Sequence, residues 1–288
     1  MKNIKNLEMF DRDMTKEELE TQIIKTHGHY ISVFNTEDQI NNADLVFKAI
    51  DFDSSNLSRV SEKFYCKYYS ELSSLLDENT YNYFPDFVYD LHHFYIAKYL
   101  EVKKDRLNDI QASFFFKHKS SLQQAIIYNP ILICGLPDAV QFELIDTVKR
   151  ILKNDPSYIR YLSSAMIMEN PDLVEEAIIA DNKIAFILSD FFFNRYPDTL
   201  VHLSSNYIEE AALKGFVAND GTIYYPVIKN GQVISSLLKR SNHAIVFVSD
   251  WSLLIMNQKK LKHILENEAL RNIFKDRHPL ICKIKNIK

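Results

Sequence analysis

Apolar positions recur every 26 residues in the middle of the chain. When the sequence is aligned on Ala125, Ile151 and Ala177, a polar residue follows each of them by four positions, and apolar residues follow by eight and eleven. The three matching sets are Asn129, Ile133, Leu136 and Pro137; Asp155, Ile159, Leu162 and Ser163; and Asp181, Ala185, Leu188 and Ser189. Apolar residues with this spacing share a helix face, and the polar residue stands where one helix ends and the next is capped.

An earlier copy of the pattern starts at Ala49, with Asp53, Leu57, Val60 and Ser61 at the matching positions. A unit of this length holds two short helices and their turns, and it cannot bury its apolar face without a stacked neighbour. The pattern predicts a mainly α fold of short helical repeats of about 26 residues. The alternative is a coincidence of apolar positions in a helix-rich sequence.

The sequence after Gly215 differs in residue composition from the sequence before it. β-branched and aromatic residues dominate several segments, and an Asn-Gly pair is the strongest short signal for a hairpin turn. The predicted elements are strands at 222–228, 232–235, 243–249 and 279–284, a hairpin turn at Asn230-Gly231, and a helix at 253–275. Together they predict a small α+β module at the C-terminal end of the sequence.

Charge divides at the same place. Residues 216–288 contain 12 Lys and Arg against 5 Asp and Glu, whereas residues 1–215 contain 22 against 33. The net charges are therefore +7 and −11, which indicates two modules with different surfaces. We expect an acidic, repeat-containing helical domain at residues 1–215 and a small basic α+β module at residues 216–288.

Composition excludes several enzyme classes. Only five glycines occur in 288 residues, and no segment matches the glycine-rich fingerprints with which dinucleotide-binding and P-loop proteins approach phosphate. No cofactor is expected. The three cysteines are widely spaced, which gives neither a disulfide framework nor a zinc-binding pair, so a reducing cytoplasmic compartment is expected.

No membrane partner is expected either. Residues 1–13 lack the apolar core of a secretory signal. An apolar stretch at residues 125–140 is broken by Asn129, Pro130 and Pro137, so it falls short of the ~18 residues that a spanning helix needs.

One set of side chains has the composition of a metal site. Asp86, Asp90 and His93 are four and three residues apart, on one face of a helix expected to start at Pro85. Two carboxylates and an imidazole on one face are ligands for a divalent metal. In the alternative interpretation, Asp86 interacts with the N-terminus of the helix and His93 is an ordinary surface residue. This alternative is favoured because no second helix offers further metal ligands.

Basic and aromatic clusters are candidates for contact with a partner. The basic candidates are Lys239, Arg240, Lys259, Lys260 and Lys262, which form either a solvated helix face or a phosphate-backbone site. The aromatic candidates are Phe114, Phe115 and Phe116, which are consecutive and cannot all face one core from a helix. Aromatic residues of this kind anchor protein interfaces.

The segment Asn170-Pro171-Asp172-Leu173-Val174-Glu175-Glu176-Ala177-Ile178, followed by Ile187-Leu188-Ser189, carries a resemblance. It resembles the helical repeats of an uncharacterised domain family of intracellular bacterial pathogens and large DNA viruses, over residues 120–211. Those units have an acidic start, a Leu/Val-Ala-Val core and an exit of leucine with a small residue. The resemblance implies an interaction scaffold and assigns no catalytic residues.

Three functions are compatible with these observations. The first is a non-enzymatic binding protein, such as a pathogen or phage effector or an inhibitor, that docks on a protein partner. The second is a nucleic-acid-associated protein that acts through the basic module. The third is an enzyme whose site is assembled from residues far apart in the sequence.

Overall fold

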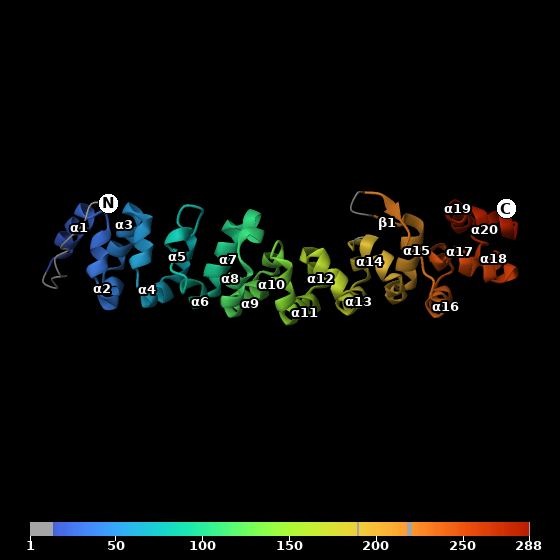
Figure 1. The fold of residues 1–288 in the computed structure, drawn as a ribbon, viewed down its shortest axis with the longest axis horizontal. Coiled ribbons are helices and arrows are strands. Elements are labelled where there is room, and N and C mark those ends of the chain that lie inside the picture. Colours follow the sequence, from blue (N-terminus) through green and yellow to red (C-terminus); the bar gives the residue numbers. More distant parts are fainter. Residues whose placement is uncertain (1–13, 189, 218–220, 288) are drawn as a thin grey trace. The chain divides into compact units, whose positions relative to one another are not determined.

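The chain is mainly α-helical with one small β-hairpin (Figure 1). The computed structural model describes residues 14–188, 190–217 and 221–287. It confirms the predicted fold class, a mainly α chain with a small α+β element. Residues 1–13 and Ser189, which entered the sequence predictions, lie outside the described residues. Within the described part, no helix is both long enough and apolar enough to cross a membrane.

The longer α-helices share a length of ten residues. They are α1 Lys16–Lys25, α3 Ala43–Phe52, α7 His93–Val102, α9 Lys119–Tyr128, α11 Ile145–Asn154, α13 Pro171–Ala180, α15 Ser205–Lys214, α16 Gly231–Arg240 and α19 Glu268–Arg277. Helices of six residues are α2 Thr36–Asn41, α4 Glu62–Lys67, α5 Tyr69–Ser74, α8 Ala112–Lys117, α10 Asp138–Glu143, α12 Ser164–Glu169, α14 Asp190–Arg195 and α17 Asp250–Ile255. The remaining α-helices are α6 Val88–Leu91, α18 Gln258–Ile264 and α20 Pro279–Lys285.

Short 3₁₀ helices separate many of these elements. They are η1 His29–Val33, η2 Ser54–Arg59, η3 Tyr81–Tyr83, η4 Lys104–Asp109, η5 Pro130–Ile133, η6 Pro156–Tyr161, η7 Asn182–Phe186, η8 Pro197–His202 and η9 Asn242–Phe247. The strands are β1 Phe216–Val217 and β2 Ile223–Tyr224, which pair antiparallel with Phe216 opposite Tyr224 and Val217 opposite Ile223.

The helices recur in a fixed order with a fixed spacing. Helices α7, α9, α11 and α13 begin 26 residues apart, and in each case a 3₁₀ helix begins 11 residues later and a six-residue helix 19 residues later. The sets that begin at α3 and α16 have the same internal spacing. Ala125, Ile151 and Ala177 are each the seventh residue of their ten-residue helix, and each is at most 3% exposed. We call each set of three helices a recurring unit.

The polar residue four positions later joins two helices of a unit. Asp155 ends α11, where its backbone N–H donates to the Ile151 carbonyl. Its carboxylate accepts a hydrogen bond of 2.9 Å from the Ser157 N–H, which caps η6. Asp53 and Asp181 cap η2 and η7 in the same way. Capping satisfies backbone donors that the first turn of a helix leaves without partners, so this residue type fixes where each 3₁₀ helix starts.

Several predictions for the C-terminal part were wrong. Asn230-Gly231 is not a hairpin tip, because the Asn230 side chain accepts from the backbone of Gln232 and Val233 and caps α16. Residues 232–235 belong to α16, residues 243–249 form η9 and an extended exit, and residues 279–284 lie in α20. Of the predicted strands, 222–228 contains β2, whose partner β1 precedes it in the sequence. The predicted strand 243–249 contributes only a single parallel bridge, from Val248 to Ile228.

The burial of the apolar residues in these segments explains the errors. Leu237, Ile245 and Val248 are at most 1% exposed and stand at the positions of Ile151, Ile159 and Leu162 in the α11 unit. A short, fully buried apolar run reads as a strand from its residue types alone. Here the run belongs to one more recurring unit.

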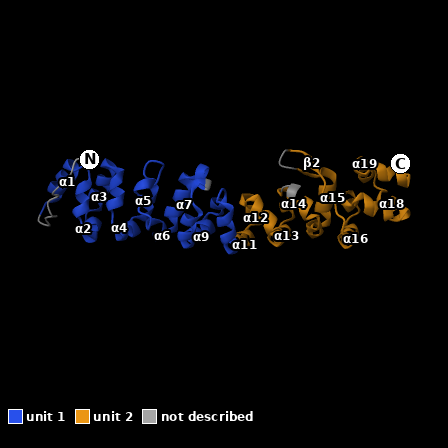
Figure 2. Cartoon of the chain, viewed as in Figure 1, with its two compact units in different colours: residues 1–147 blue, residues 148–288 orange. Residues whose placement is uncertain are grey.

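Contacts divide the chain into two compact units, residues 1–147 and 148–288 (Figure 2). This division differs from the predicted one at residues 215 and 216. Helix α15 ends at Lys214 and packs against η9 and α19, so residues on both sides of Gly215 belong to the second unit. The change of charge near Gly215 therefore occurs within one packed unit.

Aromatic side chains form a large part of each core. In the first unit, Tyr65 and Tyr95 are fully buried with ring centroids 5.8 Å apart. The Tyr65 hydroxyl donates to the Leu57 carbonyl at 2.7 Å, and burial raises the pKa of Tyr65 far above its usual value. In the second unit, Phe193 and Phe216 are buried with centroids 4.9 Å apart. Phe216 thus ties the small hairpin to the helices before it.

The three cysteines should differ in reactivity. Cys66 and Cys134 are exposed, whereas Cys282 is buried in α20, and burial raises the pKa of its thiol. Because the thiolate is the reactive form, we expect a disulfide reagent such as Ellman's reagent to label two thiols quickly and the third only on unfolding. Cys282→Ser should remove only the slow thiol. Rapid labelling of all three in the native protein would contradict this packing of α20.

Candidate binding site

The residues proposed for a metal site separate in the structure. Helix α6 is one turn long, His92 caps α7, and His93 is the first residue of α7. The single helix face expected to carry Asp86, Asp90 and His93 does not exist. His93 stacks on Tyr128 instead, with ring centroids 4.5 Å apart and planes at 5°.

Asp86 and Asp90 converge on a residue that sequence reasoning missed, His118. This ring is fully buried, with Nε2 3.0 Å from Asp86 Oδ1 and Nδ1 2.9 Å from Asp90 Oδ1, although the second contact lacks hydrogen-bond geometry. The Lys117 ammonium, hydrogen-bonded to Asp86, lowers the pKa of that carboxyl group. In residues 14–188, 190–217 and 221–287, no group of three or more His, Cys, Asp or Glu side chains is arranged to hold a metal ion. The contacts of His118 join the C-terminal end of α8 to Asp86, which precedes α6, and to Asp90, which lies in α6.

The aromatic candidates contribute mainly to the core. Phe115 is fully buried, and Phe114 packs against Tyr89 and Tyr99 with centroid distances of 5.3 and 4.9 Å. Only Phe116 is substantially exposed, at 44%. Of these three candidates, Phe116 alone presents a largely exposed ring, in keeping with the expectation that consecutive aromatics cannot all face one core.

The basic candidates fall into two kinds. The Arg240 guanidinium donates to the carbonyls of Val201 and Leu203, so it fastens the end of η8. The four lysines, Lys239, Lys259, Lys260 and Lys262, are exposed, and none forms an ion pair with another described residue.

A groove with a basic rim lies between α11 and α13 in the second unit. Its volume is about 470 Å³. The lining residues are Lys149, Arg150, Leu152, Lys153, Leu173, Glu176, Ala177 and Ala180. Leu152, Leu173 and Ala177 are buried and form the floor, whereas the four charged residues are exposed. We call this cavity the basic groove.

Small residues on α13 leave the space open. Ala180 is the tenth residue of its helix, and the equivalent residues are Tyr128 in α9 and Asn154 in α11. Ala177 has Ile151 as its equivalent in α11. Because alanine stops at Cβ, α13 presents a shallow apolar surface where a longer side chain would fill the groove.

The cations of the basic groove have no partners in the chain. Among the described residues, Lys149, Arg150 and Lys153 form neither an ion pair nor a side-chain hydrogen bond, although Glu176 lines the same groove. Like charges at this spacing on a helix are mildly unfavourable. The helix dipole favours only Lys153, which lies in the last turn. Helix stability therefore does not account for three cations here.

Comparison with the other recurring units shows that the cations are specific to α11. The equivalent residues are Phe47, Lys48 and Asp51 in α3; Ala97, Lys98 and Glu101 in α7; Gln123, Gln124 and Ile127 in α9; Glu175, Glu176 and Ile179 in α13; and Ser235, Ser236 and Lys239 in α16. Where lysines occur in α3 and α7, they pair with Glu20 and Glu101. The scaffold thus repeats its core positions, but the basic rim occurs once among these units.

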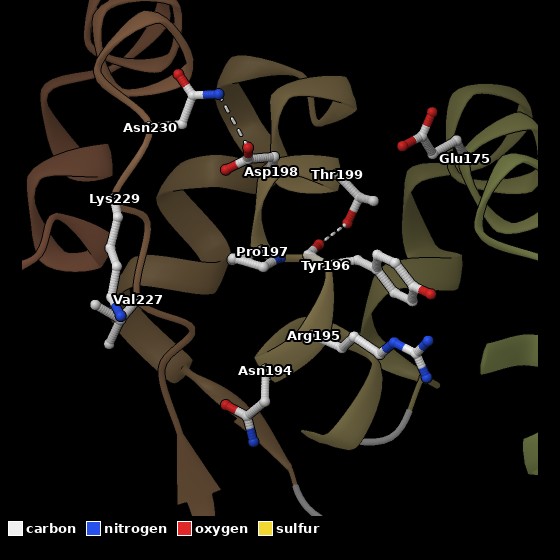
Figure 3. Close-up of a pocket in the computed structure, with 10 residues that line it drawn as sticks. All are labelled: Glu175, Asn194, Arg195, Tyr196, Pro197, Asp198, Thr199, Val227, Lys229 and Asn230. Atoms are coloured by element: carbon white, nitrogen blue, oxygen red, sulfur yellow. Dashed lines mark hydrogen bonds between the residues drawn. The ribbon is translucent and has the colours of Figure 1, made fainter. Parts of the chain in front are cut away.

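A second cavity lies at the point in the chain where the 26-residue spacing of the ten-residue helices stops. The next ten-residue helix after α13 would begin at residue 197, but the 3₁₀ helix η8 begins there instead. The cavity has a volume of about 450 Å³, and its lining comes from α13, the junction of α14 with η8, and residues 227–230 (Figure 3).

Most polar groups of this second cavity already have partners. The Asn230 amide donates to Asp198 at 3.1 Å, and Thr199 donates to the Tyr196 carbonyl at 2.8 Å (Figure 3). Arg195 lies 3.5 Å from Glu169, and Glu175 lies 3.6 Å from His202. The cavity holds two cationic and two anionic side chains, so it offers no excess charge to a ligand. The basic groove is therefore the stronger candidate.

Sequence reasoning missed Lys149, Arg150 and Lys153, although a signal was present. The three residues lie on α11 among Val148, Ile151 and Leu152, which are all buried. Comparison of equivalent residues in the aligned units would have shown the excess of cations. Searches of family models, of curated proteins and of solved structures gave no match.

Proposed function

We propose that this chain is a non-enzymatic binding protein that docks on a protein partner through the basic groove. The observation that carries the proposal is the set of three unpaired cations above an apolar floor of Leu152, Leu173 and Ala177. A complementary segment carries two or three carboxylates and one apolar side chain. An effector or an inhibitor acts through docking of this kind.

The groove supplies two kinds of interaction. Exposed ion pairs contribute about 0.2–1 kcal/mol each, so three of them change affinity by roughly threefold to 150-fold. One aliphatic side chain placed against Leu152, Leu173 and Ala177 adds about 1.5–3 kcal/mol if it is fully buried. Because the ion pairs are exposed, we expect the affinity to fall as salt rises.

Charge reversal provides the test. The triple variant Lys149→Glu, Arg150→Glu and Lys153→Glu should weaken binding of a fluorescein-labelled peptide in which Asp and Glu flank a central Leu. We expect a loss of at least about tenfold in fluorescence anisotropy titrations at low salt, because attraction becomes repulsion at each site.

A matched control separates the groove from overall charge. The triple variant Lys259→Glu, Lys260→Glu and Lys262→Glu changes net charge by the same amount and alters only exposed residues of α18. It should leave affinity within about threefold of the parent protein. Equal losses in the two triple variants, or no peptide binding by the parent protein, would contradict the proposal. Circular dichroism checks that each variant is folded.

Filling the groove tests its shape without changing any charge. Ala180→Phe places a ring where the exposed last residue of α13 now leaves space. We expect weaker binding of the peptide with the central Leu, and little change for a peptide with Ser in its place. Unchanged binding of the first peptide would show that the floor of the groove takes no part.

A further inference from the structure

Helices α17 and α20 in the second unit lie side by side and run in the same direction. At the N-terminal ends, Nδ1 of His278, the N-cap of α20, lies 2.6 Å from Oδ1 of Asp250, the first residue of α17. At the C-terminal ends, Nζ of Lys285, the last residue of α20, donates to the carbonyls of Leu254 at 2.6 Å and of Met256, the C-cap of α17, at 3.0 Å. Links at both ends hold the two helices side by side, and they join residues that are 28 to 31 apart in the sequence.

Four exposed apolar side chains lie on these two neighbouring helices. Trp251 and Ile255 are one turn apart on α17, and Leu280 and Ile284 are one turn apart on α20. Their exposed fractions are 73%, 73%, 63% and 62%, respectively. Large apolar side chains that gather on an exposed surface mark sites of contact with a partner or a membrane. We call these four residues the apolar face.

The cores of the same helices are already complete. Leu253 of α17 is fully buried, and Ile281 of α20 is 2% exposed, so both helices have other side chains that pack inward. The apolar face is therefore a second apolar surface that the fold leaves uncovered. None of its residues lines either cavity of the second unit described above.

Three lysines without ion-pair partners lie on α20 or at the start of α18. Lys283 lies on α20 and is exposed. Lys259 and Lys260 follow Gln258, whose amide donates to the Lys285 carbonyl at 2.7 Å, so the start of α18 adjoins the end of α20. Among the described residues, none of these three lysines forms an ion pair. The only carboxylate on α17 or α20 is that of Asp250, which is engaged by His278.

We propose that the apolar face, with Lys259, Lys260 and Lys283, adsorbs to the surface of an anionic lipid bilayer. Trp is the residue type that prefers the boundary between headgroups and acyl chains. Aliphatic side chains enter that boundary while lysines remain at the anionic headgroups. Adsorption of this kind needs no spanning helix. The sequence predicted no membrane partner because it contains neither a secretory signal nor a spanning segment, and the proposed adsorption departs from that prediction.

A second copy of the chain fits this surface less well. In a symmetric dimer the same patch meets itself, so the lysines of one copy would face the lysines of the other. An anionic bilayer complements both the charge and the apolar side chains. An acidic protein surface or a nucleic acid complements the charge of the lysines. Both classes of partner are tested as competitors of the vesicles.

Trp251 is the only tryptophan in the sequence, so its fluorescence reports on this face alone. Adding vesicles of phosphatidylcholine with roughly one-third phosphatidylserine should shift its emission to shorter wavelength and shield it from iodide, because the indole leaves water. Pure phosphatidylcholine vesicles should cause a much smaller shift. An absent shift, or an equal shift with both vesicles, would overturn the proposal.

Variants separate the apolar and the charged contributions in a vesicle co-sedimentation assay. Ile255→Ser with Ile284→Ser should lower the bound fraction at least about fivefold, as should Lys259→Gln, Lys260→Gln and Lys283→Gln together. The matched control is Ile179→Ser, which removes an equally exposed apolar side chain, 60% exposed, from α13. It should leave sedimentation unchanged. A loss in the control as large as in the apolar variant would contradict a specific face.

Two soluble polyanions test the other classes of partner. Single-stranded DNA or an acidic peptide should displace the protein from vesicles only at high concentration, and neither should shift Trp251 emission to shorter wavelength. If DNA causes the shift and binds more tightly than vesicles, the face is a nucleic-acid surface and the lipid proposal fails. If the acidic peptide does so, the face belongs to a protein partner and the lipid proposal also fails.

Discussion

Gly28→Ala is expected to destabilise the first unit by about 3–5 kcal/mol, through backbone strain and overpacking. Gly28 follows α1 with a φ of +86°, a conformation that residues with a Cβ rarely adopt. A Cβ at this position would lie 2.3 Å from Asn56 Nδ2 and 2.5 Å from the Ala49 carbonyl oxygen. Asn56 is fully buried and donates to that carbonyl and to the His27 carbonyl, so it cannot move aside without losing both bonds.

Two other glycines separate strain from steric conflict. Gly221 has a φ of +83°, and no atom lies within 4 Å of the point that a Cβ would occupy, so Gly221→Ala should cost about 1 kcal/mol. Gly231 has no such φ and faces open space at the start of α16, so Gly231→Ala should be neutral or slightly stabilising. Urea denaturation monitored by circular dichroism gives the three values. Similar losses for Gly28→Ala and Gly221→Ala would show that the contact with Asn56 and Ala49 is misplaced.

Leu188→Ala should destabilise the second unit by about 2–5 kcal/mol, because it removes a buried side chain and leaves a cavity. Leu188 is 3% exposed and occupies the position of Leu162 in the preceding recurring unit. Its neighbour Ile187 is 43% exposed and provides a matched control.

Thermal and urea denaturation compare the two variants under the same conditions. Ile187→Ala should cost less than about 1 kcal/mol, since much of the side chain remains in water. A cost below about 0.5 kcal/mol for Leu188→Ala would place this residue on the surface and contradict the burial of the recurring position.

The helical recurrence could be predicted from sequence because each of its causes is local. Asp155 caps the helix that follows it within two residues, and Ile159 and Leu162 lie close behind on one buried face. The 26-residue spacing needs only residue types at fixed intervals. The same reasoning failed at 243–249, where a buried Ile-Val-Phe-Val run has the composition of a strand. In that segment, only the match to the equivalent positions of the α11 unit distinguishes a 3₁₀ helix from a strand.

The candidate sites depend on residues that are distant in sequence. His118 is 32 residues from Asp86, and no spacing rule connects them. The basic groove is open because Ala180 of α13 has a short side chain beside α11. This cause can be recognised only once it is known that these two helices are neighbours. The apolar face likewise depends on the alignment of α17 with α20, which is set by His278 and Lys285. Residue types were sufficient to predict the helices, whereas the candidate binding surfaces depend on how the helices pack.

Hydrogen exchange with and without the acidic peptide tests most directly whether the basic groove is the binding site. At a saturating concentration of the peptide with the central Leu, backbone amides of residues 145–154 and 171–180 should exchange more slowly. Those of α3, α16 and α18 should be unchanged. This result is expected because the peptide would contact α11 and α13 and stabilise them against local opening. Protection confined to residues 258–264, or slower exchange spread evenly over all helices, would contradict the assignment of the groove.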